Sequence, residues 1–277
     1  MLFLWIAIAS LLFSLIGCAC TGAFTSLSWQ WMLPVGFVVS FLLLVVVAFL
    51  FLLYLCSRVD QNVEQEKDDP LYRKVTNLYI RSVLPILKIH VKTKGLEKVP
   101  TDRRFMLVCN HTSISDPILL LYAMPKSQLA FISKKENSDM FVIGPMMHKL
   151  QCQLINREND REALKTILKC IQILKEDKAS IGVFPEGGIN DDLKFHHFRP
   201  GVFKIAQKTK VPIVVCTLKN TKDVVPNIKR WKRSDVELSV LQVVQPEEFE
   251  GITTVELANR IHKVMAEELG PDLVAED

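Results

Sequence analysis

The first part of the chain is an apolar segment without charge. No lysine, arginine, aspartate or glutamate precedes Arg58, and the apolar residues fall into two runs, 2–19 and 32–56. Each run has about the 20 residues that a helix needs to cross a bilayer. The residues between them include Trp29 and Trp31, and tryptophan is typical of a membrane–water interface. The pattern therefore predicts a membrane hairpin of two helices over residues 1–56.

The charges that follow the hairpin predict its orientation. Arg58, Lys67, Arg73 and Lys74 come after the second run, and the positive-inside rule then places the rest of the chain in the cytoplasm. Two other interpretations stay open. Residues 2–19 resemble a signal peptide, although no basic residue precedes them as such peptides require. The hairpin could also enter the membrane and return without crossing it.

A connector and an amphipathic helix follow over residues 57–88. The first part of this segment is rich in charged and amide side chains. From Leu71 onward apolar residues recur at a helical period, which is broken near Pro85.

The remaining residues alternate between strand-like and helical segments. Short apolar runs typical of buried strands occur at residues 105–109, 128–132, 152–155, 180–184, 212–217 and 236–244. Helical patterns separate several of them. The clearest is residues 161–175, after a possible cap at Asp160, and the last opens at Thr253 and closes at Gly270. This alternation predicts one α/β domain over residues 89–277, with a single mixed sheet flanked by helices.

Composition and charge exclude several classes of protein. The net charge of +4 is mild and accompanies no nucleic-acid motif, so we expect no nucleic-acid partner. The 7 cysteines form no Cys-x-x-Cys pair and are expected to be reduced. His196 and His197 lack a third ligand at metal-binding spacing, which favours a polar loop over a metal site. The basic residues 229–233 suit either anionic lipid headgroups or a solvated face.

Two polar motifs follow predicted strands, and ligands bind beyond the carboxyl ends of strands in open α/β sheets. Asn110, His111 and Asp116 follow the first strand, and Glu186 and Gly187 follow the strand at 180–184. An aspartate that orients an imidazole leaves the other ring nitrogen free to act as a base. Adjacent glycines can present N–H groups to an oxyanion. Each motif also has a structural interpretation, because Asp116 suits a helix N-terminus and glycines suit an ordinary turn.

The order of these motifs resembles the lysophosphatidic acid acyltransferase family of the glycerolipid acyltransferases. Asn-His-x-x-x-x-Asp is matched at residues 110–116, and Phe-Pro-Glu-Gly at residues 184–187. The family's other blocks are matched in order by Lys134-Lys135-Glu136, Gly144-Pro145, Ile155-Asn156-Arg157, Phe198-Arg199-Pro200-Gly201 and Val211-Pro212-Ile213-Val214. The resemblance covers about residues 70–245.

The resemblance implies that a fatty acyl group moves from acyl-CoA or acyl carrier protein to the hydroxyl of lysophosphatidic acid, giving phosphatidic acid. His111 would be the general base and Asp116 its orienter. The residues implied in substrate binding are Asn110, Lys134, Arg157, Glu186, Gly187 and Arg199. No cofactor or metal is expected beyond the thioester donor, and the partners are the lyso-phospholipid acceptor and membrane lipids.

One departure from the family leaves the acceptor open. After Phe-Pro-Glu-Gly the family continues Thr-Arg-Ser, with an arginine associated with the acceptor's phosphate, whereas this chain has Gly188-Ile189-Asn190. Lys134, Arg157 or Arg199 would then do more of the work. Another lyso-lipid or polar-lipid acceptor is an alternative. So are a membrane acyl-thioesterase, in which His111 activates water, and a non-catalytic lipid-binding protein.

Overall fold

The computed structural model describes residues 2–156 and 159–275. The chain divides into two compact units, Met1–Asp60 and Gln61–Asp277. Each unit is described by itself below.

The first unit is a pair of apolar helices, α1 (Leu2–Cys20) and α2 (Trp29–Ser57), joined through a short 3-10 turn at Ala23–Thr25. Both helices are long and apolar enough to cross a membrane, as predicted. Two serines link them: Ser14 Oγ donates to the Leu33 carbonyl at 2.6 Å, and Ser40 Oγ donates to the Ser10 carbonyl at 3.2 Å. Hydroxyl groups that bond across helices stabilise such pairs where no water competes.

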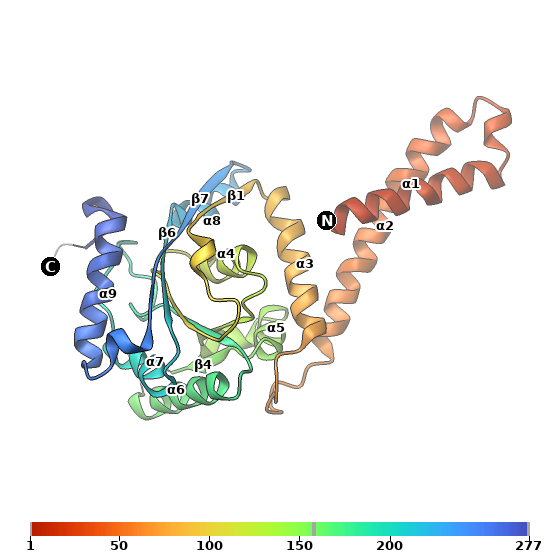
Figure 1. The fold of residues 1–277 in the computed structure, drawn as a ribbon. Coiled ribbons are helices and arrows are strands. Elements are labelled where there is room, and N and C mark those ends of the chain that lie inside the picture. The colour runs from red at the N-terminus through yellow and green to blue at the C-terminus, as the bar shows by residue number, and fades with distance from the viewer. Residues whose placement is uncertain (1, 157–158, 276–277) are drawn as a thin grey trace. The chain divides into compact units, whose positions relative to one another are not determined.

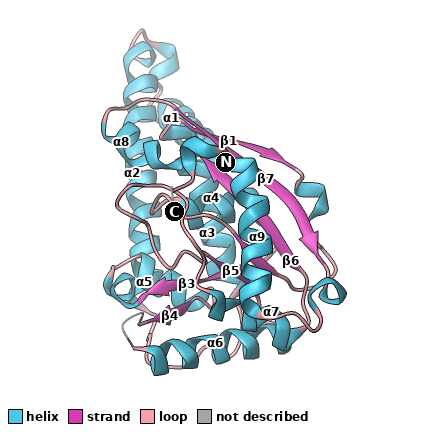
Figure 2. Ribbon diagram, turned by 90° about the vertical axis from the view of Figure 1, so that its left-hand side faces the viewer, coloured by secondary structure: helices cyan, strands magenta, loops and turns pink. Residues whose placement is uncertain are grey.

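The second unit is built on one seven-stranded mixed sheet with the order β1-β7-β6-β2-β5-β3-β4 (Figures 1 and 2). Its strands are β1 (Ile89–Lys94), β2 (Met106–Val108), β3 (Leu129–Lys134), β4 (Gln153–Ile155), β5 (Ser180–Val183), β6 (Ile213–Lys219) and β7 (Ser234–Val244). Strands β6, β2, β5, β3 and β4 are mutually parallel, β7 is antiparallel to β6, and β1 is parallel to β7. The predicted mixed α/β sheet is confirmed.

Helices cover both faces of this sheet (Figure 2). Their bounds are α3 (Pro70–Ile86), α4 (Asp116–Ala123), α5 (Ile143–Lys149), α6 (Asp160–Lys175), α7 (Lys204–Thr209), α8 (Val224–Lys229) and α9 (Thr254–Leu269). Successive side chains of a strand point to opposite faces, and in β2 Met106 and Val108 join a core with α6, α7 and α9. Leu107 joins a second core with α3, α4 and α8. Burial on both faces explains why this strand is continuously apolar.

Two details of the sequence interpretation are corrected by the structure. The N-cap of α6 is Asn159, whose Oδ1 accepts the backbone N–H groups of Arg161 and Glu162, and not Asp160. Strand β1 was not predicted, because only its first residue, Ile89, is buried and it lies at the edge of the sheet. Helix α9 agrees with the prediction: Thr253 caps it and Gly270 ends it.

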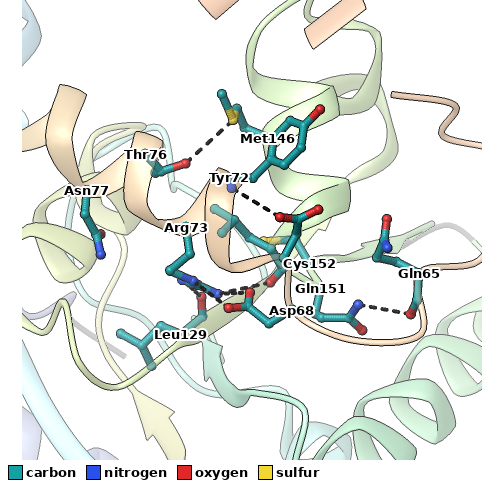
Figure 3. A network of polar contacts seen from close by, with 12 residues as sticks. Gln65, Asp68, Tyr72, Arg73, Thr76, Asn77, Leu129, Met146, Gln151 and Cys152 are labelled. Atoms are coloured by element: carbon teal, nitrogen blue, oxygen red, sulfur yellow. Dashed lines mark hydrogen bonds and ion pairs between the residues drawn. The ribbon is translucent and has the colours of Figure 1, made fainter. Parts of the chain in front are cut away.

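A polar network holds the segment before α3 against the sheet (Figure 3). The buried Arg73 guanidinium donates to both carboxylate oxygens of Asp68, at 2.7 and 3.2 Å, and its Nη1 donates to the Leu129 carbonyl of β3 at 2.8 Å. Gln151 Nε2 donates to the Gln65 carbonyl at 3.0 Å. These contacts fix the chain before α3 to the β3 side of the sheet.

Candidate active site

Asn110 sets the position of the first motif. It follows β2, is buried, and bonds to β6 in both directions: its Nδ2 donates to the Leu218 carbonyl at 2.9 Å, and its Oδ1 accepts the Leu218 N–H at 2.8 Å. The side chain thus extends the pairing of β2 with β6 past the last strand residue. His111 is thereby placed at the carboxyl edge of the parallel strands, where α/β sheets bind ligands.

The side chains of His111 and Asp116 are in contact. The Nδ1 atom of His111 lies 2.9 Å from Oδ2 of Asp116, which is fully buried. The same oxygen accepts the backbone N–H groups of Thr112 and Ser113, both at 2.9 Å. The cap position of α4 is Ser115, with no side-chain capping bond. The Asp116 carboxylate therefore accepts hydrogen bonds from the loop that carries His111. Asp116 is also the first residue of α4.

This arrangement defines how the imidazole is used. An ionised carboxylate only accepts hydrogen bonds, so His111 must donate through Nδ1–H and keep Nε2 unprotonated when the ring is neutral. Within the described part of the chain Nε2 has no hydrogen-bond partner, and the side chain is 15% exposed. The ring stacks on Phe184, with centroids 4.2 Å apart and planes at 20°. The ring is therefore oriented by Asp116 and Phe184, with Nε2 unpartnered within the described part of the chain.

Glu186 joins the two motifs and the loop that follows them. Its Oε1 accepts the backbone N–H of His111 at 2.8 Å. Its Oε2 accepts the backbone N–H of His196 at 3.1 Å and a bond from Asn190 Nδ2 at 3.2 Å. Burial raises the pKa of Glu186 to about 7; the two backbone donors lower it and the nearby Asp116 carboxylate raises it. Glu186 thus holds the His111 segment against the loop at 187–199.

Gly187 and Arg199 lie against each other beside this turn. Gly187 has φ +87°, which strains any other residue, and a Cβ atom there would lie 2.6 Å from Nε of Arg199, so a side chain would also displace the arginine. The N–H of Gly187 donates to the Phe184 carbonyl at 3.1 Å, as in an ordinary turn. The N–H of Gly188 has no partner among the described residues. The N–H of Glu186, inside the turn, likewise has no partner among the described residues.

Lys134 and Arg157 are the two remaining residues that the sequence predicts in substrate binding. Lys134 is the last residue of β3 and is exposed, at the same edge of the sheet as His111 because β3 and β2 both run parallel to β5. Arg157 lies outside the described residues. The structure thus brings together Asn110, His111, Asp116, Glu186, Gly187 and Arg199, and places Lys134 at the same edge.

Of the adjacent histidines at residues 196–197, His196 bonds within the loop, whereas His197 stacks on His262 of α9. His196 Nε2 lies 2.9 Å from Asp192, and its backbone N–H binds Glu186. Among residues 2–156 and 159–275, no group of three histidine, cysteine, aspartate or glutamate side chains is arranged to hold a metal ion.

Three contributors to the site were given no role from the sequence. Phe184 stacks on His111, Asn190 donates to Glu186, and Thr221 shares a hydroxyl hydrogen bond of 2.7 Å with Thr112. Phe184 carried a signal as the last apolar residue of its strand-like run. Asn190 and Thr221 carried none, because loop polar residues are common and their partners are distant in sequence.

The comparisons with known proteins agree with this fold. The Acyltransferase family model matches residues 90–219. The crystal structure of the 1-acyl-sn-glycerophosphate acyltransferase PlsC from Thermotoga maritima is similar with a TM-score of 0.62 and 25% identity, covering 79% of this chain and 86% of that one. These matches define an acyltransferase-type α/β domain.

Curated relatives indicate which kind of acyltransferase the chain resembles. A chloroplastic 1-acyl-sn-glycerol-3-phosphate acyltransferase of Arabidopsis thaliana is 32% identical over 57% of this chain and 45% of its own length. One of Chlamydomonas reinhardtii is 30% identical over 72% of this chain and 59% of its own length. The chain is thus similar in sequence and fold to the lysophosphatidic acid acyltransferase family. It spans about half the length of these two relatives.

Proposed function

We propose that this protein transfers a fatty acyl group from a thioester donor to the hydroxyl of lysophosphatidic acid, forming phosphatidic acid. The observation that carries the proposal is the 2.9 Å contact between His111 Nδ1 and the buried Asp116 carboxylate, which leaves Nε2 as an accessible base. The names of the relatives support the substrate, since they are 1-acyl-sn-glycerol-3-phosphate acyltransferases.

In this mechanism Nε2 of His111 takes the proton of the acceptor hydroxyl as its oxygen attacks the thioester carbon. Asp116 then stabilises the imidazolium cation that forms. The tetrahedral intermediate collapses, the C–S bond breaks, and the His111 imidazolium gives its proton to the departing thiolate, which leaves as the free thiol. General-base help of this kind contributes about 10²- to 10⁴-fold. Positioning of the two substrates and charge stabilisation must supply the rest.

The oxyanion of the intermediate needs donors, and the N–H of Gly188 is our candidate because it is free within the described part of the chain. Its neighbour Gly187 keeps the turn open by having no side chain. Donors that are fixed before the reaction stabilise developing charge without reorganising. We propose no cofactor or metal for these steps, and acyl-CoA or acyl carrier protein as the donor.

The acceptor's phosphate requires cations at the same edge. Ile189 occupies the position of the family's arginine and is exposed. We assign the phosphate to Arg199, which lies against Gly187, and to Lys134, with Arg157 as a further candidate from the sequence. Because Ile189 supplies no charge, a lyso-lipid or polar-lipid hydroxyl without a terminal phosphate monoester is the second candidate acceptor.

We further propose that the hairpin anchors the protein in a membrane with the second unit on the cytoplasmic side. The two apolar helices and the relatives indicate membrane association. The orientation rests on the basic residues that follow the second helix, of which Arg58 is the first.

A panel of acceptors tests the proposed substrate. Purified protein in mixed micelles is given labelled acyl-CoA or acyl carrier protein thioester, with lysophosphatidic acid, other lyso-phospholipids or monoacylglycerol, and the products are identified by mass spectrometry. We expect phosphatidic acid to form fastest. Acylation of another lyso-lipid in preference would establish the second candidate, and free fatty acid without any acceptor would establish a thioesterase.

A further inference from the structure

The turn that joins α8 to β7 carries an exposed tryptophan among basic residues. Trp231 is 58% exposed and has φ +53°. Its carbonyl accepts from Lys88 Nζ at 3.3 Å, and the same ammonium lies 5.1 Å from the centroid of its ring. We call Lys88 together with residues 229–233 the basic tip.

Hydrogen bonds order the backbone of the basic tip. Lys232 N donates to the Asn227 carbonyl at 2.9 Å, and Asn227 Nδ2 donates to the Arg233 carbonyl and to Ser234 Oγ. A bulky residue is uncommon in the left-handed region and persists only where its surroundings fix it. These bonds fix the backbone of the turn, and the Trp231 ring on it is exposed.

The charge of the basic tip is mostly uncompensated. Arg233 pairs with Asp235, with its shortest contact at 2.6 Å. The four other cations form no ion pair within the described part of the chain; they are Lys88, Lys229, Arg230 and Lys232. An exposed aromatic ring in a turn rich in cations without ion pairs matches an anionic membrane surface, where the ring enters the interface and the cations meet headgroups.

The basic tip lies at the same edge of the sheet as His111. Val108 of β2 pairs with Val215 of β6, and the end of β6, Lys219, pairs with Glu237 near the start of β7. Because β7 runs antiparallel to β6, the turn before Ser234 extends from the edge at which β2 ends. Two strand spacings, roughly 10 Å, separate β2 from β7 across the sheet.

Other exposed apolar side chains lie at this edge. Ile114, in the loop between His111 and Asp116, is 73% exposed. Ile86, at the end of α3 and two residues before Lys88, is 43% exposed. Both side chains add exposed apolar surface to the edge that carries the basic tip.

We propose that the basic tip is a second membrane contact, separate from the hairpin, that binds anionic lipid headgroups and sets the His111 edge of the sheet against the bilayer. An acidic protein partner is less well matched, since Trp231, Ile114 and Ile86 favour an apolar layer beneath the charges. Only Arg58 to Asp60 separate the end of α2 from the second unit. The contact goes beyond the proposed reaction and does not require it.

The fluorescence of Trp231 in the full chain tests this contact. Substituting Trp5→Phe, Trp29→Phe and Trp31→Phe leaves Trp231 as the sole tryptophan. The protein is reconstituted in vesicles of phosphatidylcholine alone or with phosphatidylglycerol, each containing brominated lipid. We expect quenching by the brominated lipid and a blue shift that depend on phosphatidylglycerol, with protection from aqueous acrylamide.

Two charge variants in the same background make the test specific. Lys229→Gln, Arg230→Gln and Lys232→Gln together should abolish the lipid quenching. The matched control removes three charges from α7 and the residue after it, before the amino end of β6, by Lys204→Gln, Lys208→Gln and Lys210→Gln, and should leave the quenching intact. Equal acrylamide access in both vesicle types would overturn the proposal. So would an equal loss in the two variants, or a spectral response to acidic acyl carrier protein without one to anionic lipid.

Discussion

The Oε1 atom of Glu186 accepts the backbone N–H of His111 at 2.8 Å, although 75 residues separate the two in sequence. The second carboxylate oxygen binds the loop that carries His196. One buried side chain thus ties the segment of the candidate base to the turn of the second motif. The glutamate of the Phe-Pro-Glu-Gly motif therefore has a structural role in this chain that does not depend on contact with substrate.

Replacement of Glu186 by glutamine should change how stability depends on pH. Burial raises the pKa of Glu186 from 4.5 to about 7, so the folded chain keeps a proton that the unfolded chain releases between these values. The stabilisation is complete below pH 4.5 and is lost as pH rises to 7, by roughly 3 kcal/mol at most. In thermal unfolding in detergent from pH 4.5 to 8, the wild type should lose stability relative to Glu186→Gln. The exposed Glu247→Gln serves as the control, and a pH-independent difference would refute the assignment.

Asp116→Asn should reduce acyl transfer without unfolding the protein. The amide oxygen can still accept from the loop, but the negative charge that stabilises a His111 cation is gone. We expect the initial rate to fall by roughly 10²- to 10⁴-fold, measured as thiol release at saturating acceptor. Asp223→Asn, also at the start of a helix and without a side-chain capping bond, should retain full activity. A rate near that of the wild type would mean that Asp116 is only structural.

Arg73→Ala should be strongly destabilising. It leaves the Asp68 carboxylate buried without its partner and frees the Leu129 carbonyl. Removing one member of a buried pair costs about 3–5 kcal/mol, whereas the exposed Arg103–Asp102 pair is screened by solvent and should contribute little. Denaturant unfolding of Arg73→Ala and Arg103→Ala compares the two directly. Similar midpoints would show that the network in Figure 3 does not stabilise the fold.

Two substitutions with opposite expected effects on KM test where the acceptor's phosphate binds. Arg199→Gln should raise KM for lysophosphatidic acid about tenfold, the lower end for a lost charged hydrogen bond at an exposed site. Ile189→Arg, which restores the family's residue, should lower it. Both should leave KM for the acyl donor unchanged, as should Arg161→Gln at the start of α6. If neither variant changed KM for this acceptor, the phosphate would not be bound at this turn.

The sequence predicts the parts of the fold that depend on local pattern. Continuous apolar runs marked the strands buried on both faces, and helix caps marked α9 within one residue. Strand β1 was not predicted, because it lies at the edge of the sheet and only one of its residues, Ile89, is buried. The cap of α6 was misplaced by one residue because Asn159 and Asp160 are both good capping residues, and only the geometry distinguishes them.

The sequence predicted only those residues of the site that belong to a recognisable motif. The spacing of His111 and Asp116 permitted a hydrogen bond, and the structure has one. The exchange between Asn110 and Leu218 and the contact of Asn190 with Glu186 depend on which strands become neighbours. That information is non-local and no short motif contains it.

The most direct test of the central claim is release of free thiol from acyl-CoA, with and without lysophosphatidic acid, by the wild type and His111→Ala. His90→Ala, on the exposed edge strand β1, is the control. We predict release that requires the lipid, persists in the control, and falls by at least about 100-fold in His111→Ala at unchanged thermal stability. Lipid-dependent release that survives in His111→Ala would contradict the assignment of His111 as the base.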